Sequence, residues 1–228
     1  MMTWLLLIGV PLLLGLWAQM RVSSAFGRWK QVAATSGVTG AQAAREILSA
    51  ANINDVEVLE INDLLGDHYD PTQKRLCLST DVYNTPSVAA LGIAAHECGH
   101  AIQHQKAYAP LKWRMAIVPV TQIASNMLPF IFLGGLFFGL LKLAMLAVAV
   151  YLVLTLFQLI TLPVEFDASR RAKIILQQMG IIRPGEEAAG VNQVLDAAAL
   201  TYVAAFVASL GTLLYFLLIL TGSRGNER

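Results

Sequence analysis

The sequence predicts an α-helical multi-pass membrane protein that carries a small α+β unit. Of its 228 residues, 56% are hydrophobic and only 14% are charged, a balance that is typical of membrane proteins. The hydrophobic residues gather in four apolar segments, each long enough to cross a bilayer as a helix. Between the first and second segments lies a more polar region, residues 21–114, in which helical and strand patterns both occur. This mixture predicts the α+β unit.

The first apolar segment, residues 1–20, is predicted to be transmembrane helix 1. Trp4 and Trp17 stand near its two ends, where aromatic side chains anchor a helix at the membrane interface. A cleaved signal peptide would begin with basic residues and end in a small-residue cleavage site. Neither feature is clear in this segment, so we expect the helix to be retained.

Two further apolar runs, separated only by Lys142, predict a transmembrane hairpin of helices 2 and 3 over residues 115–164. Residues 202–221 are predicted to be transmembrane helix 4, and residues 222–228 form a short tail. Residues 165–201, between the third and fourth spans, are expected to be helical, with a break at Gly180 to Gly185 around Arg183-Pro184. The sequence therefore predicts four spans and two polar regions, one on either side of the hairpin in sequence.

The distribution of basic residues favours one orientation in the membrane. If the loops after spans one and three lie on the same side, that side holds most of the basic residues near the spans: Arg21, Arg28, Lys30, Lys112, Arg114, Arg170, Arg171, Lys173 and Arg183. The opposite side holds only Lys142, Arg224 and Arg228. We expect a multi-pass protein of the cell membrane. Because lysine and arginine accumulate in cytoplasmic loops, both termini are predicted outside and both polar regions in the cytoplasm.

Within residues 21–114, local patterns predict one amphipathic helix and two short strands. Thr39 and Gln42 have the spacing of a capping box at a helix N-terminus. The helix that follows has an apolar face of Ala41, Ala44, Ile47, Leu48 and Ala51. Residues 56–61 and 74–79 have the composition of β-strands, and residues 66–71 have the composition of a turn.

The most specific motif in the chain is His96-Glu97-Cys98-Gly99-His100, which lies in an apolar, helix-forming run. Thr85-Pro86 predicts the start of this helix, as an N-cap followed by proline at the first helical position. Residues four apart on a helix share a face, so His96 and His100 can present two imidazoles to one metal ion. Glu97, next to them, can accept a proton from a water molecule that the metal activates. This arrangement is typical of zinc metallopeptidases.

A catalytic zinc ion needs a third protein ligand and one open position. His104 lies one turn beyond His100, but ligands on three successive turns of a straight helix cannot converge on a tetrahedral ion. Glu165 and Asp167, where the third span ends, are the acidic candidates, and the predicted topology places them on the same side as the histidines. Helical geometry turns these two side chains about 200° apart, so only one can face the ion.

Four segments of the chain together resemble the YugP-type neutral zinc metallopeptidases of bacterial membranes. They are Asp67-His68-Tyr69-Asp70-Pro71, the helix from Val88 to His104, Glu165-Phe166-Asp167-Ala168-Ser169, and Ala198-Ala199-Leu200-Thr201-Tyr202-Val203. The resemblance covers essentially the whole chain. The chain is also similar, more distantly, to the HtpX-type and CAAX-processing membrane proteases. The resemblance implies a zinc-dependent membrane metallopeptidase with a zincin-like, gluzincin-type catalytic unit.

The resemblance also implies residue roles. Glu165 matches the glutamate that binds zinc, and His96 and His100 match the two histidine ligands. The distant relatives carry, four residues after that glutamate, an aspartate that orients a ligand histidine. Ser169 holds this position here, and the nearest aspartate is Asp167. A serine hydroxyl can still accept an imidazole N–H, more weakly than a carboxylate would.

These observations predict peptide hydrolysis by a zinc-activated water with Glu97 as the general base. His68, Tyr69 and Tyr202 are candidates for stabilising the transition state, and the sequence does not choose among them. The strand near Leu76 is expected to pair with an extended substrate by adding an edge. The expected partners are the lipid bilayer and a protein or peptide substrate, which can be a membrane protein. No nucleic-acid partner is expected.

Two other classes of function compete with this prediction. A protease that cuts inside the membrane would need the His-Glu-x-x-His motif within a span, and the apolar stretch before His96 is too short for one. A membrane scaffold or chaperone-like adaptor without turnover could keep a zinc fold. Such a scaffold needs the metal ligands but not the base, so the presence of Glu97 favours an enzyme.

Overall fold

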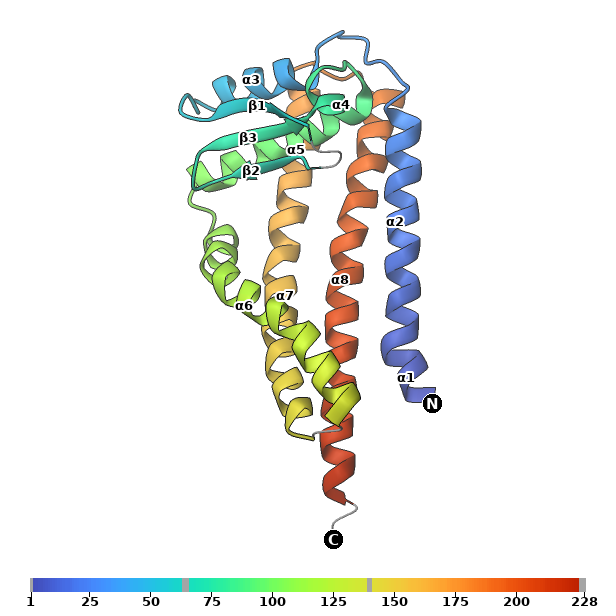
Figure 1. Cartoon of the computed structure of the whole chain (residues 1–228). Helices are drawn as coiled ribbons and strands as arrows, with labels where there is room; N and C mark the ends of the chain where they lie inside the picture. Colours follow the sequence, from blue (N-terminus) through green and yellow to red (C-terminus); the bar gives the residue numbers. More distant parts are fainter. Residues whose placement is uncertain (1, 63–65, 139–140, 226–228) are drawn as a thin grey trace. The chain divides into compact units, whose positions relative to one another are not determined.

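The computed structural model describes residues 2–62, 66–138 and 141–225. The structure is mostly helical, with four long apolar helices and one small sheet (Figure 1). Its elements are α1 (Met2–Trp4), the short π-helix η1 (Leu5–Gly9), α2 (Val10–Trp29), α3 (Gly40–Ala50), β1 (Glu57–Ile61), β2 (His68–Asp70), β3 (Arg75–Ser79), α4 (Thr80–Tyr83), α5 (Val88–Gln105), α6 (Ala109–Phe138), α7 (Leu141–Gln178) and α8 (Glu186–Gly225).

The chain divides into two compact units. The first, which we call the helical unit, comprises residues 1–18, 113–162 and 201–228. The second, the α/β unit, comprises residues 19–112 and 163–200. Four long helices, α2, α6, α7 and α8, contribute residues to both units.

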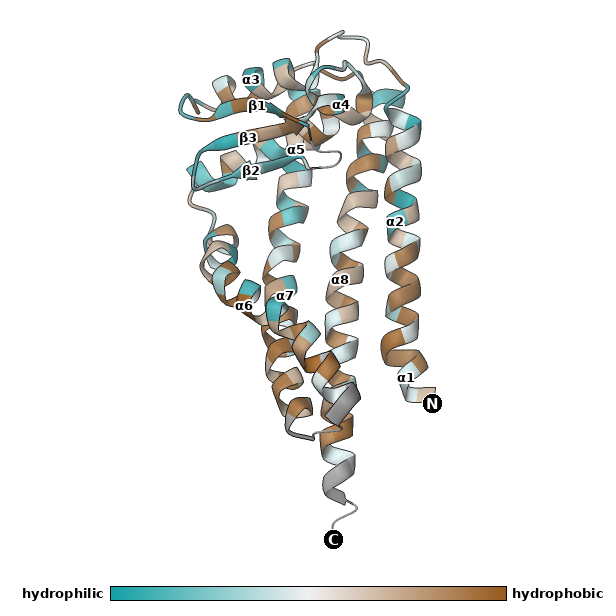
Figure 2. Cartoon of the chain, in the orientation of Figure 1, coloured by the Kyte–Doolittle hydropathy of each residue, from teal (hydrophilic) through white to brown (hydrophobic). Residues whose placement is uncertain are grey.

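Within the part of the chain that the structure describes, four helices are long and apolar enough to cross a membrane, in agreement with the number of spans predicted from the sequence. They cover Met2–Trp29, Ala109–Gly135, Leu143–Gln178 and Glu186–Gly222. Figure 2 shows the apolar residues along these helices. Many large apolar side chains of the helical unit are exposed, among them Leu13, Ile123 and Phe130. Exposure of this extent fits contact with lipid better than contact with water.

Small residues allow the helices of the helical unit to pack. Ala124 and Ile131 of α6 form a buried cluster with Ala147 and Val150 of α7. Gly211 of α8 lies against the N-terminal helix, because a Cβ atom at this position would stand 2.2 Å from the carbonyl oxygen of Leu7. Close backbone approach at alanine and glycine is the usual way in which membrane helices associate.

The α/β unit contains a three-stranded sheet in the order β1-β3-β2. β1 runs parallel to β3, with Val58 opposite Leu76, and β2 runs antiparallel to β3, with Tyr69 opposite Leu76. The two strands predicted from the sequence are confirmed as β1 and β3. The predicted turn over residues 66–71 is wrong in part, because its central residues pair with β3 as β2. This pairing gives the second edge of β3 the hydrogen-bond partners that a buried strand requires.

β3 is the central strand, and this position corrects one expectation. Leu76 lies in β3, whose two edges are already occupied by β1 and β2. The strand near Leu76 therefore cannot add a substrate strand. The outer strands of the sheet are β1 and β2.

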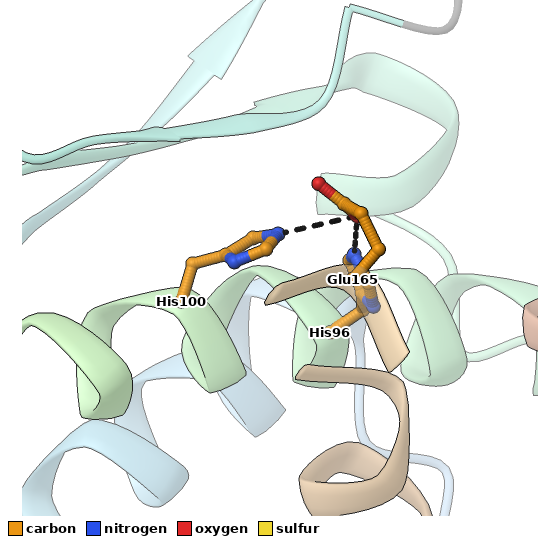
Figure 3. A group of neighbouring side chains, drawn as sticks. All are labelled: His96, His100 and Glu165. Carbon is orange, nitrogen blue, oxygen red and sulfur yellow. Dashed lines mark hydrogen bonds and ion pairs between the residues drawn. The ribbon is translucent and has the colours of Figure 1, made fainter. Parts of the chain in front are cut away.

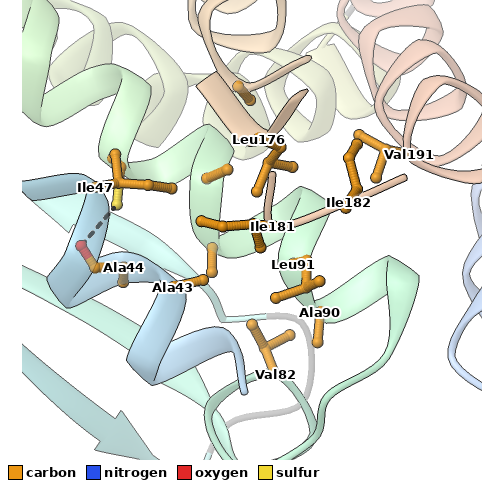
Figure 4. Close-up of a cluster of buried hydrophobic side chains, with 14 of the residues drawn as sticks. Ala43, Ala44, Ile47, Val82, Ala90, Leu91, Leu176, Ile181, Ile182 and Val191 are labelled. Carbon is orange, nitrogen blue, oxygen red and sulfur yellow. Dashed lines mark hydrogen bonds between the residues drawn. The ribbon is translucent and has the colours of Figure 1, made fainter. Parts of the chain in front are cut away.

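Helices of the α/β unit enclose one hydrophobic core (Figure 4). The capping box at Thr39 and Gln42 is confirmed, because both of its hydrogen bonds are present at the start of α3. Of the α3 face that the sequence predicted, Ala44, Ile47 and Leu48 belong to this core and Ala51, which is half-buried, packs against it. Ala41 is buried as well. Figure 4 shows Ile47 of α3, Leu91 of α5, Leu176 of α7 and Val191 of α8 as members of this one cluster. The core thus draws together helices that are far apart in the sequence.

α5 begins two residues later than Thr85-Pro86 predicted. Ser87 is the N-cap, and its hydroxyl accepts a hydrogen bond from the backbone N–H of Ala90 at 3.2 Å. Thr85 instead donates its hydroxyl hydrogen to the carbonyl oxygen of Asp81 at 2.5 Å. Threonine and serine are both good N-cap residues. Thr85 does not cap α5, because its hydroxyl is hydrogen-bonded to the short helix α4, which the sequence did not predict.

The predicted break between the third-span helix and the next helix is confirmed. α7 ends at Gln178 and α8 begins at Glu186. Gly180 and Gly185 adopt positive φ angles of +66° and +101°, a conformation that glycine accepts without steric penalty. The buried Glu187 carboxylate accepts hydrogen bonds from the backbone N–H groups of Arg183 and Thr35, both at 2.8 Å, which holds this turn in the α/β unit.

Candidate metal centre

α5 and the part of α7 in the α/β unit touch backbone to backbone at Gly99. A Cβ atom on Gly99 would lie 2.8 Å from the carbonyl oxygen of Ala168 and 3.0 Å from its Cα. Any side chain at this position would therefore push the helices apart. Gly99 lies between the two histidines of the motif in sequence, so the close approach brings the histidine face of α5 against α7.

Three side chains from these two helices converge on one point (Figure 3). Oε2 of Glu165 lies 3.2 Å from Nε2 of His96 and 3.6 Å from Nε2 of His100. One potential ligand atom from each residue lies within 4.8 Å of the others. Among the described residues, this is the group of histidine, cysteine and acidic side chains that could hold a metal ion.

The donor set fits a zinc ion. Two imidazole nitrogens and one carboxylate oxygen are ligands that zinc prefers in catalytic sites. In a tetrahedral site with bonds of the usual length, neighbouring ligand atoms stand about 3.3 Å apart. The two distances from Glu165 are close to this value. The cluster therefore resembles a metal site in both chemistry and spacing.

The remaining ring nitrogen of each histidine has its own partner. Nδ1 of His96 lies 3.1 Å from the hydroxyl oxygen of Ser169, and Nδ1 of His100 lies 3.1 Å from the amide oxygen of Gln103. An imidazole that donates its Nδ1–H in this way keeps a lone pair on Nε2 for a metal. Both rings are thus oriented with Nε2 toward Glu165.

Asp167, the competing acidic candidate, points to other partners. Its carboxylate accepts hydrogen bonds from Arg170 and Arg171, each at 2.5 Å, and from the amide nitrogen of Gln103 at 2.9 Å. Asp167 does not belong to the metal-type cluster found among the described residues. The two carboxylates thus face different surroundings, as their separation around the helix implied.

Glu97 is buried on α5 directly after His96. Burial raises the pKa of its carboxyl group, while the positive charges of His96 and His100 act in the opposite direction and the charge of Glu165 adds to the increase. These interactions show that Glu97 shares the electrostatic environment of the cluster. A carboxyl group whose pKa is raised is a stronger base than one in water.

The same environment also shifts the pKa of His100. Burial would lower the pKa of its imidazole, but the hydrogen bond with Glu165 and the charge of Glu97 outweigh burial and raise it. A metal ion binds the neutral form of an imidazole, so metal binding at this site is coupled to the protonation of His100.

Two other candidates from the sequence, His68 and Tyr69, have partners outside the cluster. The exposed His68 places Nδ1 2.7 Å from the backbone oxygen of Gly66. The hydroxyl of Tyr69 lies 2.9 Å from Nδ1 of His104 in the last turn of α5, and burial raises the pKa of Tyr69 to about 12. Tyr202 belongs to the helical unit.

Two residues at the site were missed by sequence reasoning. Gln103 is fully buried, which is uncommon for glutamine, and a polar residue three positions after His100 in an apolar helix was the available signal. Gly99 occupies a variable position of the motif, and its role depends on the partner helix. No local pattern predicts that contact.

Comparison with known proteins adds three findings. A family model described as "Putative neutral zinc metallopeptidase" matches residues 4–221. The chain is also similar to a protein of Bacillus subtilis (strain 168) described as "Putative membrane protease YugP", with 48% identity over 214 residues, which cover 94% of this chain and 95% of that protein. No solved structure matches.

Proposed function

The chain belongs to the neutral zinc metallopeptidase family, and from this membership we propose that it is a membrane-embedded zinc metalloendopeptidase. His96, His100 and Glu165 are the proposed zinc ligands, and Glu97 is the proposed general base. The observation that carries the proposal is the convergence of the three ligand atoms, with each histidine held through its other nitrogen. This orientation has a clear use if Nε2 binds a metal.

Zinc, when bound, would polarise the carbonyl group of the substrate and make a water molecule acidic enough to ionise near neutral pH. Glu97 accepts the proton from the water whose oxygen adds to the carbonyl carbon. The same carboxyl group then delivers that proton to the amide nitrogen as the C–N bond breaks, so that an acid and an amine leave. The surrounding protein buries Glu97, and this burial raises the pKa of its carboxyl group.

The proposed substrates are protein or peptide segments close to the membrane. The four candidate spans support a location in the bilayer, and Glu165 follows the third apolar segment closely in the sequence. A site tethered to the membrane meets segments of membrane proteins at a high effective concentration. The distribution of basic residues supports a site on the cytoplasmic side.

Metal removal tests the proposal. The full chain, purified in detergent, should contain about one zinc per molecule and hydrolyse unfolded casein. Dialysis against a chelator should abolish hydrolysis, and one equivalent of zinc should restore it. Hydrolysis that persists after the metal has been removed and verified as absent would contradict the proposed mechanism.

A further inference from the structure

We propose that Gln103 is a positioning residue that orients His100 toward the metal, and that Asp167 acts on the site by holding the amide of Gln103. The inference rests on the proposed function, because it assigns a role within the same metal centre. Neither residue belongs to the His-Glu-x-x-His motif, and neither belongs to the three-residue cluster.

The hydrogen bonds of Gln103 leave one orientation for its amide group. The side chain is fully buried, and its Nε2 donates to the carbonyl oxygen of Val164 at 2.8 Å and to Oδ2 of Asp167 at 2.9 Å. Its Oε1 lies 3.1 Å from Nδ1 of His100. The reversed amide would place Oε1 against a carbonyl oxygen and a carboxylate oxygen, and neither of these can donate a hydrogen.

This fixed amide selects the tautomer of His100. Because Oε1 of Gln103 can only accept, the favourable partner on His100 is a protonated Nδ1. A neutral imidazole with its hydrogen on Nδ1 has its lone pair on Nε2, the nitrogen that lies 3.6 Å from Glu165. Gln103 therefore aims the metal-binding nitrogen and sets the rotation of the ring.

Asp167 is itself held in place on α7. Its Oδ1 accepts a hydrogen bond from Nη2 of Arg170 and its Oδ2 one from Nε of Arg171, both at 2.5 Å. Two guanidinium partners keep the carboxylate charged and therefore unable to donate. The interactions form a continuous path from Arg171 through Asp167 and Gln103 to His100.

The two histidines are thus oriented by different means. A hydroxyl, that of Ser169, meets His96 directly. A carboxylate, that of Asp167, acts on His100 through a buried amide. The aspartate that the sequence places at position 167 therefore serves the opposite histidine from the one that Ser169 contacts.

The test compares Gln103→Met with Gln105→Met in the full-length protein purified in detergent. Methionine keeps the unbranched shape of glutamine and removes its hydrogen bonds. Gln105 is the matched control, since it lies on the same helix and its amide donates to the carbonyl oxygens of Ala51 and Asn52 instead. Each metal-free protein is titrated with Co²⁺ and Zn²⁺, and its thermal unfolding is recorded before metal is added.

Gln103→Met should bind both metals about 10- to 100-fold more weakly, as expected when the group that orients a ligand is removed, and its Co²⁺ absorption spectrum should change. Gln105→Met should match the wild-type chain in both. Unchanged affinity and an unchanged Co²⁺ spectrum in Gln103→Met would overturn the proposal. Because metal binding is the readout, a wild-type chain that binds zinc but cuts no peptide would refute the proposed activity and leave this inference standing.

A second variant covers the case in which Gln103→Met does not fold. Gln103→Glu combined with Asp167→Asn exchanges the amide and the carboxyl group. His100 keeps an acceptor, the two side chains keep a hydrogen bond, and a protonated carboxyl group at position 103 still has a hydrogen to donate to the carbonyl oxygen of Val164. Its Co²⁺ affinity should lie within about 10-fold of the wild-type value, with a similar spectrum. A folded double variant that binds Co²⁺ more than about 100-fold more weakly than the wild-type chain would contradict the proposed path.

Discussion

The hydroxyl oxygen of Ser169 lies 3.1 Å from Nδ1 of His96, one helical turn along α7 from Glu165. Residues four apart on a helix share a face, so α7 presents a carboxylate and a hydroxyl to the same histidine. The carboxylate meets Nε2 and the hydroxyl meets Nδ1. Both ring nitrogens of His96 are therefore positioned by one helix, which ties the geometry of the site to the packing of α7 on α5.

Ser169→Ala should weaken zinc binding by about 10-fold, because the His96 ring loses the group that orients it. Serine and alanine differ only by the hydroxyl group, so the substitution leaves little empty volume. The unfolding temperature of the metal-free protein should therefore change little. Zinc titration with a competing chelator measures the effect. Equal zinc affinity in Ser169→Ala and in the wild-type chain would show that the hydroxyl does not orient the ring.

Glu165→Ala should weaken metal retention by about 10-fold or more, because a lost ligand costs at least as much as a lost orienting group. Asp167→Ala should have a smaller effect, since Asp167 acts through Gln103 and not on the metal itself. Metal content after passage over a chelating column compares the two variants. If Asp167→Ala loses its metal while Glu165→Ala keeps it, the third ligand has been assigned to the wrong residue.

Gly99→Ala should disturb the metal centre although residue 99 contacts no metal. The added methyl group would meet the Ala168 backbone at 2.8 Å, so α7 must move away from α5 and carry Glu165 with it. We expect weaker zinc binding together with a loss of stability of about 1–3 kcal/mol, the usual range for overpacking a core. Gly92→Ala on the same helix is the control, because its Cβ would come no closer than 3.6 Å to Val191. Similar zinc affinities in the two variants would mean that the close approach is not needed.

The predicted orientation can be tested by labelling in intact cells. Gln73 is exposed between β2 and β3, and Cys77 and Cys98 are buried free thiols. In a variant with both cysteines replaced, Gln73→Cys should resist thiol reagents that do not cross membranes, because basic residues favour a cytoplasmic location for this region. Permeabilised cells should show full labelling. Labelling of intact cells would invert the topology and place the proposed site outside the cell.

Local patterns predicted those parts of the structure that depend on neighbours in sequence. Four apolar segments gave the number of long helices, and Thr39 with Gln42 marked the start of α3. The spacing of His96 and His100 brought two ring nitrogens together because a helix imposes that geometry. Glu165 was predicted as a metal ligand from its place at the end of an apolar segment and from the family resemblance. The structure places its carboxylate beside His96 and His100.

Features that depend on distant contacts could not be predicted in this way. β2 has turn-forming residues around it, and only its pairing with β3 makes it a strand. Gln103 is an ordinary polar residue in the sequence, and its importance appears only when Val164 and Asp167 of α7 meet its amide. Tyr69 was a candidate for the reaction centre, yet its hydroxyl meets His104, a contact between a strand and a helix that no spacing reveals.

The central claim is that Glu97 transfers the proton in a zinc-dependent hydrolysis, and one variant tests it most directly. Glu97→Gln keeps the shape of the side chain and removes the proton acceptor. Purified wild-type chain and Glu97→Gln should contain the same amount of zinc, while casein hydrolysis by the variant should fall by at least ~100-fold. Undiminished hydrolysis by a zinc-loaded Glu97→Gln would contradict the account, because the proton would then have to pass through another group.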